Sequence, residues 1–169
     1  MLSPTAAAKF LEGELLMLEG RAGEAVKAYG VALAMDAKNG FLEVSLAQAL
    51  WRAGQEEKAA KLLDKVLAKD PADEFALIVY GLICAGRKDV PKAEAFFRKA
   101  AEAAPGSPEA WLNLIALYKG SGDAQAAFDA AEALIAAAPD FPDGYAESGP
   151  RPPAGGGDAD NTRSWRQVE

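Results

Sequence analysis

The chain has 169 residues, of which 50% are hydrophobic and 25% are charged, a balance that is typical of a folded chain rather than a disordered one. Its formal net charge of −7 offers no broad basic surface to phosphate groups, so we do not expect nucleic acid as a partner. The sequence contains no histidine, the commonest general base and zinc ligand, and we therefore expect no enzymatic activity, no metal site and no cofactor.

The N-terminal segment, residues 1–17, does not have the pattern of a signal peptide. It is interrupted by Lys9, Glu12 and Glu14, and no small-residue cleavage site follows a basic start. No window of about 18 residues is apolar and uncharged, so we expect no membrane insertion. We expect a cytoplasmic protein, or a periplasmic one if the sequence is a piece of a longer chain. The lone Cys84 agrees with a reducing compartment.

Three prolines divide the chain into units of equal length. Pro71, Pro105 and Pro139 are evenly spaced, and each follows a run of Ala, Leu and charged residues. Extending this period in both directions predicts, in chain order, an N-terminal lead-in over 1–5, four repeats over 6–39, 40–73, 74–107 and 108–141, an aborted fifth repeat over 142–148, and a Pro- and Gly-rich flexible tail over 149–169.

Within each unit, small and large side chains recur at fixed positions. The eighth position is small in three units, with Gly13, Ala47 and Gly81, and the twenty-fourth is large in the same units, with Tyr29, Leu63 and Phe97. Such positions share one face of a first helix and one face of a second, and the small residues allow the two helices to approach closely. The pattern predicts a helical hairpin in every unit.

The turns between the two helices of each unit also recur. In three units one turn position is a glycine, which permits a positive φ: Gly20, Gly54 and Gly122. In the third unit Lys88 occupies this position. Asp89 and Asp123 are predicted N-caps of second helices, and Ser107 is a predicted N-cap of a first helix.

This unit of about 34 residues resembles the tetratricopeptide repeat family. The resemblance rests on the third and fourth units, through Leu77, Tyr80, Gly81, Ala93, Phe97, Ala100 and Pro105, and through Trp111, Leu114, Tyr118, Ala127 and Pro139. It implies an all-α, right-handed superhelical solenoid of antiparallel helix pairs. It also implies that the first helices line a concave groove in which a protein or peptide segment binds.

The resemblance places a set of mostly apolar residues on the wall of that groove. They are Phe10, Glu14, Met17, Phe41, Val44, Gln48, Trp51, Arg52, Phe75, Ile78, Leu82, Leu112 and Lys119. One subgroup of the family binds the acidic C-terminal carboxylate of chaperones through basic and amide side chains, and the matching positions here carry Phe10, Glu14, Ser45, Phe75 and Val79. We therefore expect a non-enzymatic scaffold that binds an apolar or amphipathic segment of a partner protein.

Several alternatives remain open at this point. Val44, Ile78 and Leu112 could be ordinary core between repeats, and the tail with Trp165 could fill the groove from within. The last second helix could leave an apolar end that supports homo-oligomerisation, through Phe128, Leu134, Ile135 and Tyr145. The protein would then be a self-assembling structural subunit. A third hypothesis is a small secretion-type chaperone that shields apolar segments of its client.

Overall fold

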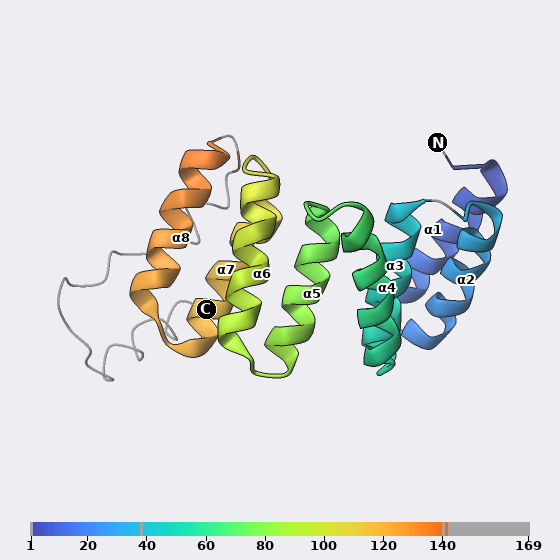
Figure 1. Ribbon diagram of the computed structural model, residues 1–169, viewed down its shortest axis with the longest axis horizontal. Helices are drawn as coiled ribbons and strands as arrows, with labels where there is room; N and C mark the ends of the chain where they lie inside the picture. Colours follow the sequence, from blue (N-terminus) through green and yellow to red (C-terminus); the bar gives the residue numbers. More distant parts are fainter. Residues whose placement is uncertain (1, 38, 140, 142–169) are drawn as a thin grey trace.

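The computed structural model describes residues 2–37, 39–139 and 141, and this part of the chain folds into eight α-helices (Figure 1). The predictions for residues 142–148 and 149–169 lie outside the described residues. The helices are α1 (Pro4–Leu18), α2 (Ala22–Met35), α3 (Gly40–Arg52), α4 (Glu56–Lys69), α5 (Glu74–Gly86), α6 (Val90–Ala103), α7 (Pro108–Ser121) and α8 (Ala124–Ala137).

The helix boundaries follow the period that the prolines set. The first helices α3, α5 and α7 begin at residues 40, 74 and 108, and the second helices α2, α4, α6 and α8 begin at residues 22, 56, 90 and 124. Only α1 departs from this spacing, because it begins at Pro4, inside the predicted lead-in. Ser3 accepts a hydrogen bond from the Ala6 amide at 3.2 Å, and Pro4 suits the first turn of a helix, so the helix starts early.

The turns have the expected backbone geometry. Gly20, Gly54 and Gly122 have φ values of 74°, 76° and 81°, and Lys88 adopts the same left-handed conformation with a φ of 61°. Four of the eight helices follow a capping Asp or Asn side chain, and these residues are Asn39, Asp73, Asp89 and Asp123. Ser107 occupies the predicted N-cap position of α7, with Pro108 in the first turn, although its side chain makes no capping hydrogen bond.

Close contacts between paired helices depend on the small residues of the repeat. A Cβ atom at Gly13 would come within 2.4 Å of the Tyr29 ring, and one at Gly81 would come within 2.4 Å of the Phe97 ring. Tyr29 and Phe97 are buried in the contact between the two helices of their unit. Glycine therefore permits an aromatic ring to fill the centre of these helix pairs.

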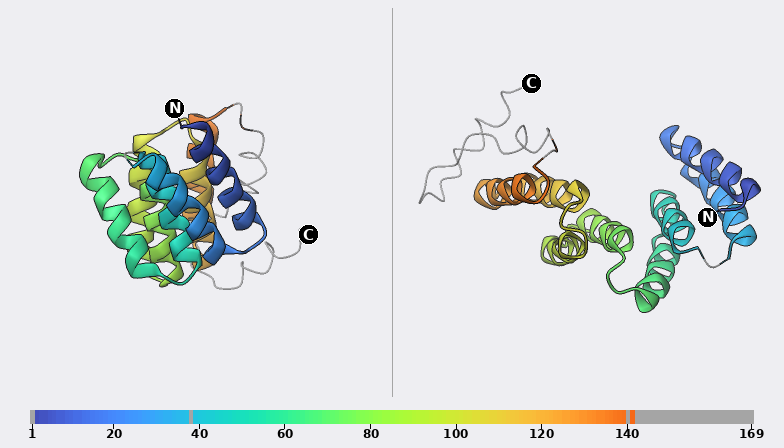
Figure 2. Two further views of the ribbon diagram at one scale, coloured as in Figure 1. Left: turned by 90° about the vertical axis from the view of Figure 1, so that its right-hand side faces the viewer. Right: turned by 90° about the horizontal axis from the view of Figure 1, so that it is seen from above.

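The helix pairs stack side by side into an arch (Figures 1 and 2). Each second helix contacts the next first helix, and along the inside α3 contacts α5, which contacts α7. The right panel of Figure 2 shows α3 and α5 on the inner side of the arch and α4 and α6 on the outer side. First helices thus line the concave surface.

Candidate partner-binding groove

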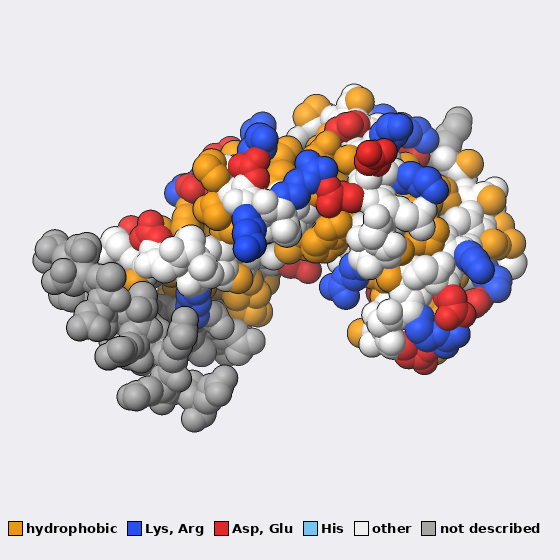
Figure 3. All heavy atoms as spheres, turned by 90° about the horizontal axis from the view of Figure 1, so that it is seen from below, with side chains coloured by type: hydrophobic (Ala, Val, Ile, Leu, Met, Phe, Trp, Pro, Cys, Tyr) orange, Lys and Arg blue, Asp and Glu red, His pale blue; other side chains and the backbone are white. Residues whose placement is uncertain are grey.

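The inner side of the arch forms an open groove. Figure 3 shows the arch from below, with two limbs that enclose a hollow and hydrophobic side chains along its inner edge. The two phenylalanines among the exposed large hydrophobic side chains, Phe41 and Phe75, are both 48% exposed. Because apolar groups of this size normally lie in the core, their exposure marks the groove as a candidate binding surface.

Phe41 and Phe75 occupy equivalent places in successive repeats. Each is the second residue of its first helix, and each helix start is fixed by a capping side chain. Asn39 accepts from the Leu42 amide at 3.3 Å, and Asp73 accepts from the Ala76 amide at 2.8 Å. The two rings therefore stand at the same register of two neighbouring helices.

An aromatic cluster extends the groove toward α1. The Phe10 ring is tilted against the Phe41 ring, with centroids 5.0 Å apart, and against the Tyr29 ring, with centroids 5.7 Å apart. The Tyr29 hydroxyl donates to Glu14 Oε1 at 2.6 Å, and burial, with this carboxylate, raises the pKa of Tyr29. The repeat pattern predicted a core position for Tyr29 but did not predict this hydrogen bond. The only indication in the sequence was that the residue is a tyrosine, whose hydroxyl needs a partner when it is buried.

Trp51 connects the second and third repeats. Its half-buried ring packs against the core of α3, α4 and α5, and a Cβ atom added at Gly86 would lie 3.7 Å from its Cζ2 atom. A methyl group at that distance would make ordinary van der Waals contact, so the indole lies beside the end of α5 without needing a glycine there. The neighbouring Arg52 is exposed.

The other predicted groove residues differ in how accessible they are. Val44 and Ile78 are each only 5% exposed and belong to the core, so the core alternative holds for both. Their side chains fill the contacts between repeats and leave little surface for a ligand. Four positions are half-buried, namely Met17, Gln48, Leu82 and Leu112, and two more are exposed, namely Glu14 and Lys119.

The expected apolar surface at the last helix is largely absent from the described residues. Leu134 is fully buried, Phe128 is 9% exposed and Ile135 is half-buried, while Tyr145 lies outside the described residues. Leu134 belongs to the core that α8 shares with α7, and Phe141 also packs against that core. The expectation of an exposed Phe128 and Leu134 was therefore wrong, because α8 turns these side chains toward its neighbour.

Within the described ranges, no group of three or more His, Cys, Asp and Glu side chains is placed to hold a metal ion. None of the helices in this part of the chain is long and apolar enough to cross a membrane. Among the expected groove residues, Phe41 and Phe75 have exposed apolar side chains, and Glu14, Arg52 and Lys119 have exposed charged side chains.

Two family models, both described as tetratricopeptide repeat, match the sequence at residues 44–108 and 85–146. Together these matches span residues 44–146, which is more than half of the chain. No curated protein matches the sequence.

Solved structures of several organisms have a similar fold. A tetratricopeptide repeat protein from Parabacteroides merdae is 25% identical, with a TM-score of 0.61 over 85% of this chain and 56% of that chain. A thermophilic protein of the same type from Thermus thermophilus is 16% identical, with a TM-score of 0.69 over 85% of this chain and 79% of that chain.

The first repeat domain of Spaghetti, solved with an HSP90 peptide, is 19% identical, with a TM-score of 0.57 over 71% of this chain and 95% of that chain. The chain thus spans just over half of the Parabacteroides protein and almost the whole of the Spaghetti domain. The expected all-α, right-handed superhelical solenoid of antiparallel helix pairs is confirmed. The chain belongs to the tetratricopeptide repeat family, whose members generally mediate contacts between proteins.

Proposed function

We propose that the protein is a non-enzymatic scaffold that binds an apolar or amphipathic segment of a partner protein in its concave groove. The observation that carries the proposal is the pair Phe41 and Phe75, each 48% exposed at the same place in two successive repeats. Two rings at one register suit a ligand that runs along the groove and buries an apolar side chain against each ring.

The residues at the positions that bind an acidic ligand in the chaperone-binding subgroup support an apolar ligand here. Spaghetti was solved with the HSP90 peptide SRMEEVD, which carries two adjacent glutamates. Where the chaperone-binding subgroup has basic and amide side chains, this chain has Phe10, Glu14, Ser45, Phe75 and Val79. Since none of these five carries a positive charge, we expect the affinity to come mainly from buried apolar surface, at about 25 cal/mol per Å² before ordering costs.

Affinity capture from the native source, followed by mass spectrometry, tests the proposal. The wild-type chain is compared with a Phe41→Gln/Phe75→Gln variant and with a Lys61→Gln/Lys99→Gln control, whose exposed side chains lie on α4 and α6. We expect one or a few proteins to be captured by the wild type and the control and lost with the groove variant. Equal capture by all three would reject the groove as the binding site.

A further inference from the structure

The N-terminal end of the solenoid carries most of its exposed apolar side chains. Seven large hydrophobic side chains are exposed in the described residues, and five of them lie on α1 and α2: Leu11, Leu15, Leu18, Val31 and Met35. Leu18 is 86% exposed and Leu11 is 64% exposed. The three leucines form one stripe of α1 at helical spacing, and Val31 and Met35 form another on α2. We term these five residues the N-terminal end face.

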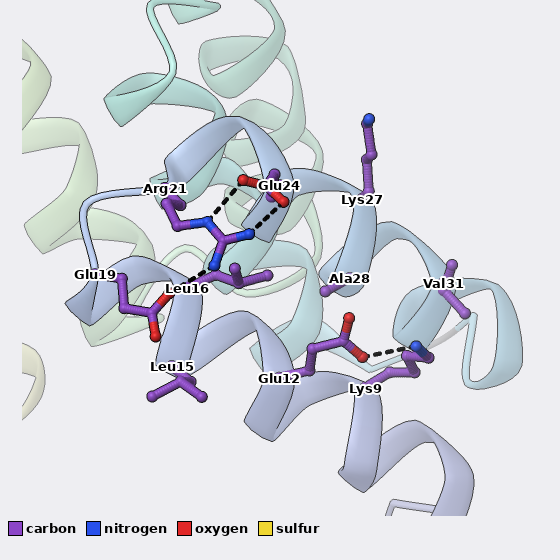
Figure 4. Close-up of a pocket in the computed structure, with 10 residues that line it drawn as sticks. All are labelled: Lys9, Glu12, Leu15, Leu16, Glu19, Arg21, Glu24, Lys27, Ala28 and Val31. Carbon is purple, nitrogen blue, oxygen red and sulfur yellow. Dashed lines mark hydrogen bonds and ion pairs between the residues drawn. The ribbon is translucent and has the colours of Figure 1, made fainter.

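A hollow of about 410 Å³ joins the two stripes. Leu15 and Val31 both line it, and Leu16 and Ala28 lie between the helices (Figure 4). Ion pairs border the hollow, with Arg21 Nη2 2.6 Å from Glu24 Oε2 and Lys9 Nζ 2.6 Å from Glu12 Oε2. Two of the five end-face residues therefore line a hollow whose other lining side chains are mostly charged.

In the later repeats, the position equivalent to Leu15 is covered by the preceding helix pair. Ala49 and Ile83, the equivalents of Leu15 in the second and third repeats, are 0% and 1% exposed. Ala49 shares a core cluster with Ala25 and Tyr29 of the preceding repeat. Position 15 thus corresponds to positions that the previous helix pair covers, and Leu15 presents a larger apolar side chain than Ala49 does.

The apolar character of the end face also goes beyond what the repeat pattern requires. Lys65 and Lys69 are the equivalents of Val31 and Met35 in the second repeat, and both are more than half exposed. In the second repeat these positions are thus exposed lysines that pair with Glu43, whereas in the first repeat they are apolar. This difference widens the apolar surface at an end of the solenoid that no other repeat of the described chain covers.

The surface that best matches the end face is the end face of a second copy. Among the described residues, no exposed large hydrophobic side chain lies on α7 or α8, whereas the end face of a second copy offers five. The charged residues that line the hollow form a rim without net charge, although the whole chain has a net charge of −7. They comprise three basic and three acidic residues: Lys9, Arg21, Lys27, Glu12, Glu19 and Glu24. Two such rims can meet without net repulsion.

We propose that two copies of the chain dock N-terminal end face to N-terminal end face about a two-fold axis. The contact covers the leucine stripe of α1 and the apolar stripe of α2 in both copies. Phe41 and Phe75 lie on the groove wall and not among the end-face residues, so both grooves stay open. The dimer then presents two grooves on one particle, which raises the avidity for a partner with two binding segments.

The mass of the 169-residue chain in solution tests this proposal. Sedimentation equilibrium from about 1 to about 100 µM is expected to show a species of twice the 17.7 kDa chain mass at the upper concentrations. Leu15→Glu and Leu18→Glu should each give a monomer, and the helical circular dichroism should stay unchanged because both side chains are exposed. The matched control Phe75→Glu, which places the same charge in the groove, should stay dimeric.

A mixing experiment distinguishes the two-fold arrangement from other assemblies. A Leu15→Glu/Leu18→Glu variant and a Leu15→Lys/Leu18→Lys variant should each be monomeric, and an equimolar mixture should dimerise because the opposed faces now carry opposite charges. A wild-type monomer at every concentration, a dimer that survives the glutamate substitutions, or a mixture that stays monomeric would each overturn the proposal. A monomer that still captures a partner through Phe41 and Phe75 would leave the groove function intact.

Discussion

The Phe97 ring occupies the space that a side chain at Gly81 would need, since an added Cβ would lie 2.4 Å from its Cε1 atom. In the other three repeats, the positions equivalent to 81 and 97 carry different pairs of residues. They hold Gly13 with Tyr29, Ala47 with Leu63, and Ile115 with Ala131, and all of these are buried. Where one residue is larger, the other is smaller, so the two positions share one volume between the paired helices.

We predict that Gly81→Ala destabilises the protein although alanine favours helices. The added methyl group meets a rigid ring, and overpacking of this kind costs about 1–3 kcal/mol, against a gain in helix propensity of about 1 kcal/mol. The free energy of unfolding in urea should therefore fall by up to about 2 kcal/mol. Adding Phe97→Leu should restore part of the loss, because that pair reproduces the Ala47 and Leu63 combination.

Gly30→Ala is the matched control for this prediction. Gly30 lies inside α2, and a Cβ atom there would meet nothing within 4 Å. The substitution should raise the free energy of unfolding by about 0.5–1 kcal/mol. If Gly81→Ala stabilised the protein as much as Gly30→Ala does, the shared-volume explanation would be wrong.

A second prediction concerns Glu43, the one buried charged residue in the described part of the chain. Lys65 and Lys69 bind its two oxygens at 2.7 and 2.9 Å, yet both lysines are exposed and can be hydrated without it. The equivalent residue of the third repeat is the buried Leu77. Glu43→Leu should therefore leave stability unchanged or raise it by up to about 4 kcal/mol in urea unfolding. Glu43→Ala, the cavity control, should lower it by about 2 kcal/mol.

Glu43 also makes stability depend on pH. Burial alone would raise its pKa, but the hydrogen bonds and charges of Lys65 and Lys69 outweigh burial and hold the pKa below its ordinary value of 4.5. Because the folded state binds the proton less readily, this contribution is present above about pH 4.5 and is lost as the pH falls through the lowered pKa. Wild type should lose more stability than Glu43→Gln below about pH 4.5, and equal losses would contradict this.

Lys88 provides a third prediction, from its left-handed backbone. Its φ of 61° costs a residue with a Cβ atom about 1–2 kcal/mol, whereas the equivalent positions of the other repeats carry Gly20, Gly54 and Gly122. Glycine also has more freedom in the unfolded chain, which offsets part of the gain. Lys88→Gly should therefore raise the free energy of unfolding by about 0.5–1 kcal/mol. Gly54→Ala should lower it, and the same sign for both variants would argue against backbone strain as the cause.

The period of the sequence predicted the helices and their turns well, because both depend on local chemistry. The positive φ of Gly54 and the capping by Asp89 and Asp123 follow from residue type within a few positions. The apolar ends were predicted less well. Leu15 and Leu134 are both leucines on helices at the ends of the solenoid. Only the folded structure shows that Leu134 is buried while Leu15 is 57% exposed.

The composition of the groove was only partly predictable for the same reason. The family resemblance placed Val44 and Phe41 on one wall, but the structure buries Val44 and exposes Phe41. Position in a repeat fixes the direction of a side chain, whereas its accessibility depends on the size of its neighbours in the next repeat. The ion pairs of Glu43 were not predicted, because they join residues 22 and 26 positions apart through flexible lysine side chains.

A fourth prediction concerns the salt dependence of partner binding. If buried apolar surface provides the affinity, the Kd of a peptide made from a captured segment should change by less than about 3-fold between about 50 and 500 mM NaCl. Titration calorimetry of the same peptide should give a negative heat-capacity change. A Kd that rises steeply with salt would indicate an ionic site instead.

The measurement that tests the central claim most directly is the affinity of that peptide for groove variants. Phe41→Ala and Phe75→Ala each remove an exposed ring, so the helicity of the protein should be unchanged. Each substitution should weaken peptide binding by about 1–3 kcal/mol. This corresponds to a Kd about 5- to 150-fold higher, while Lys99→Ala on the outer helix α6 should keep the wild-type Kd. A peptide that binds both phenylalanine variants with the wild-type Kd would contradict binding in the concave groove.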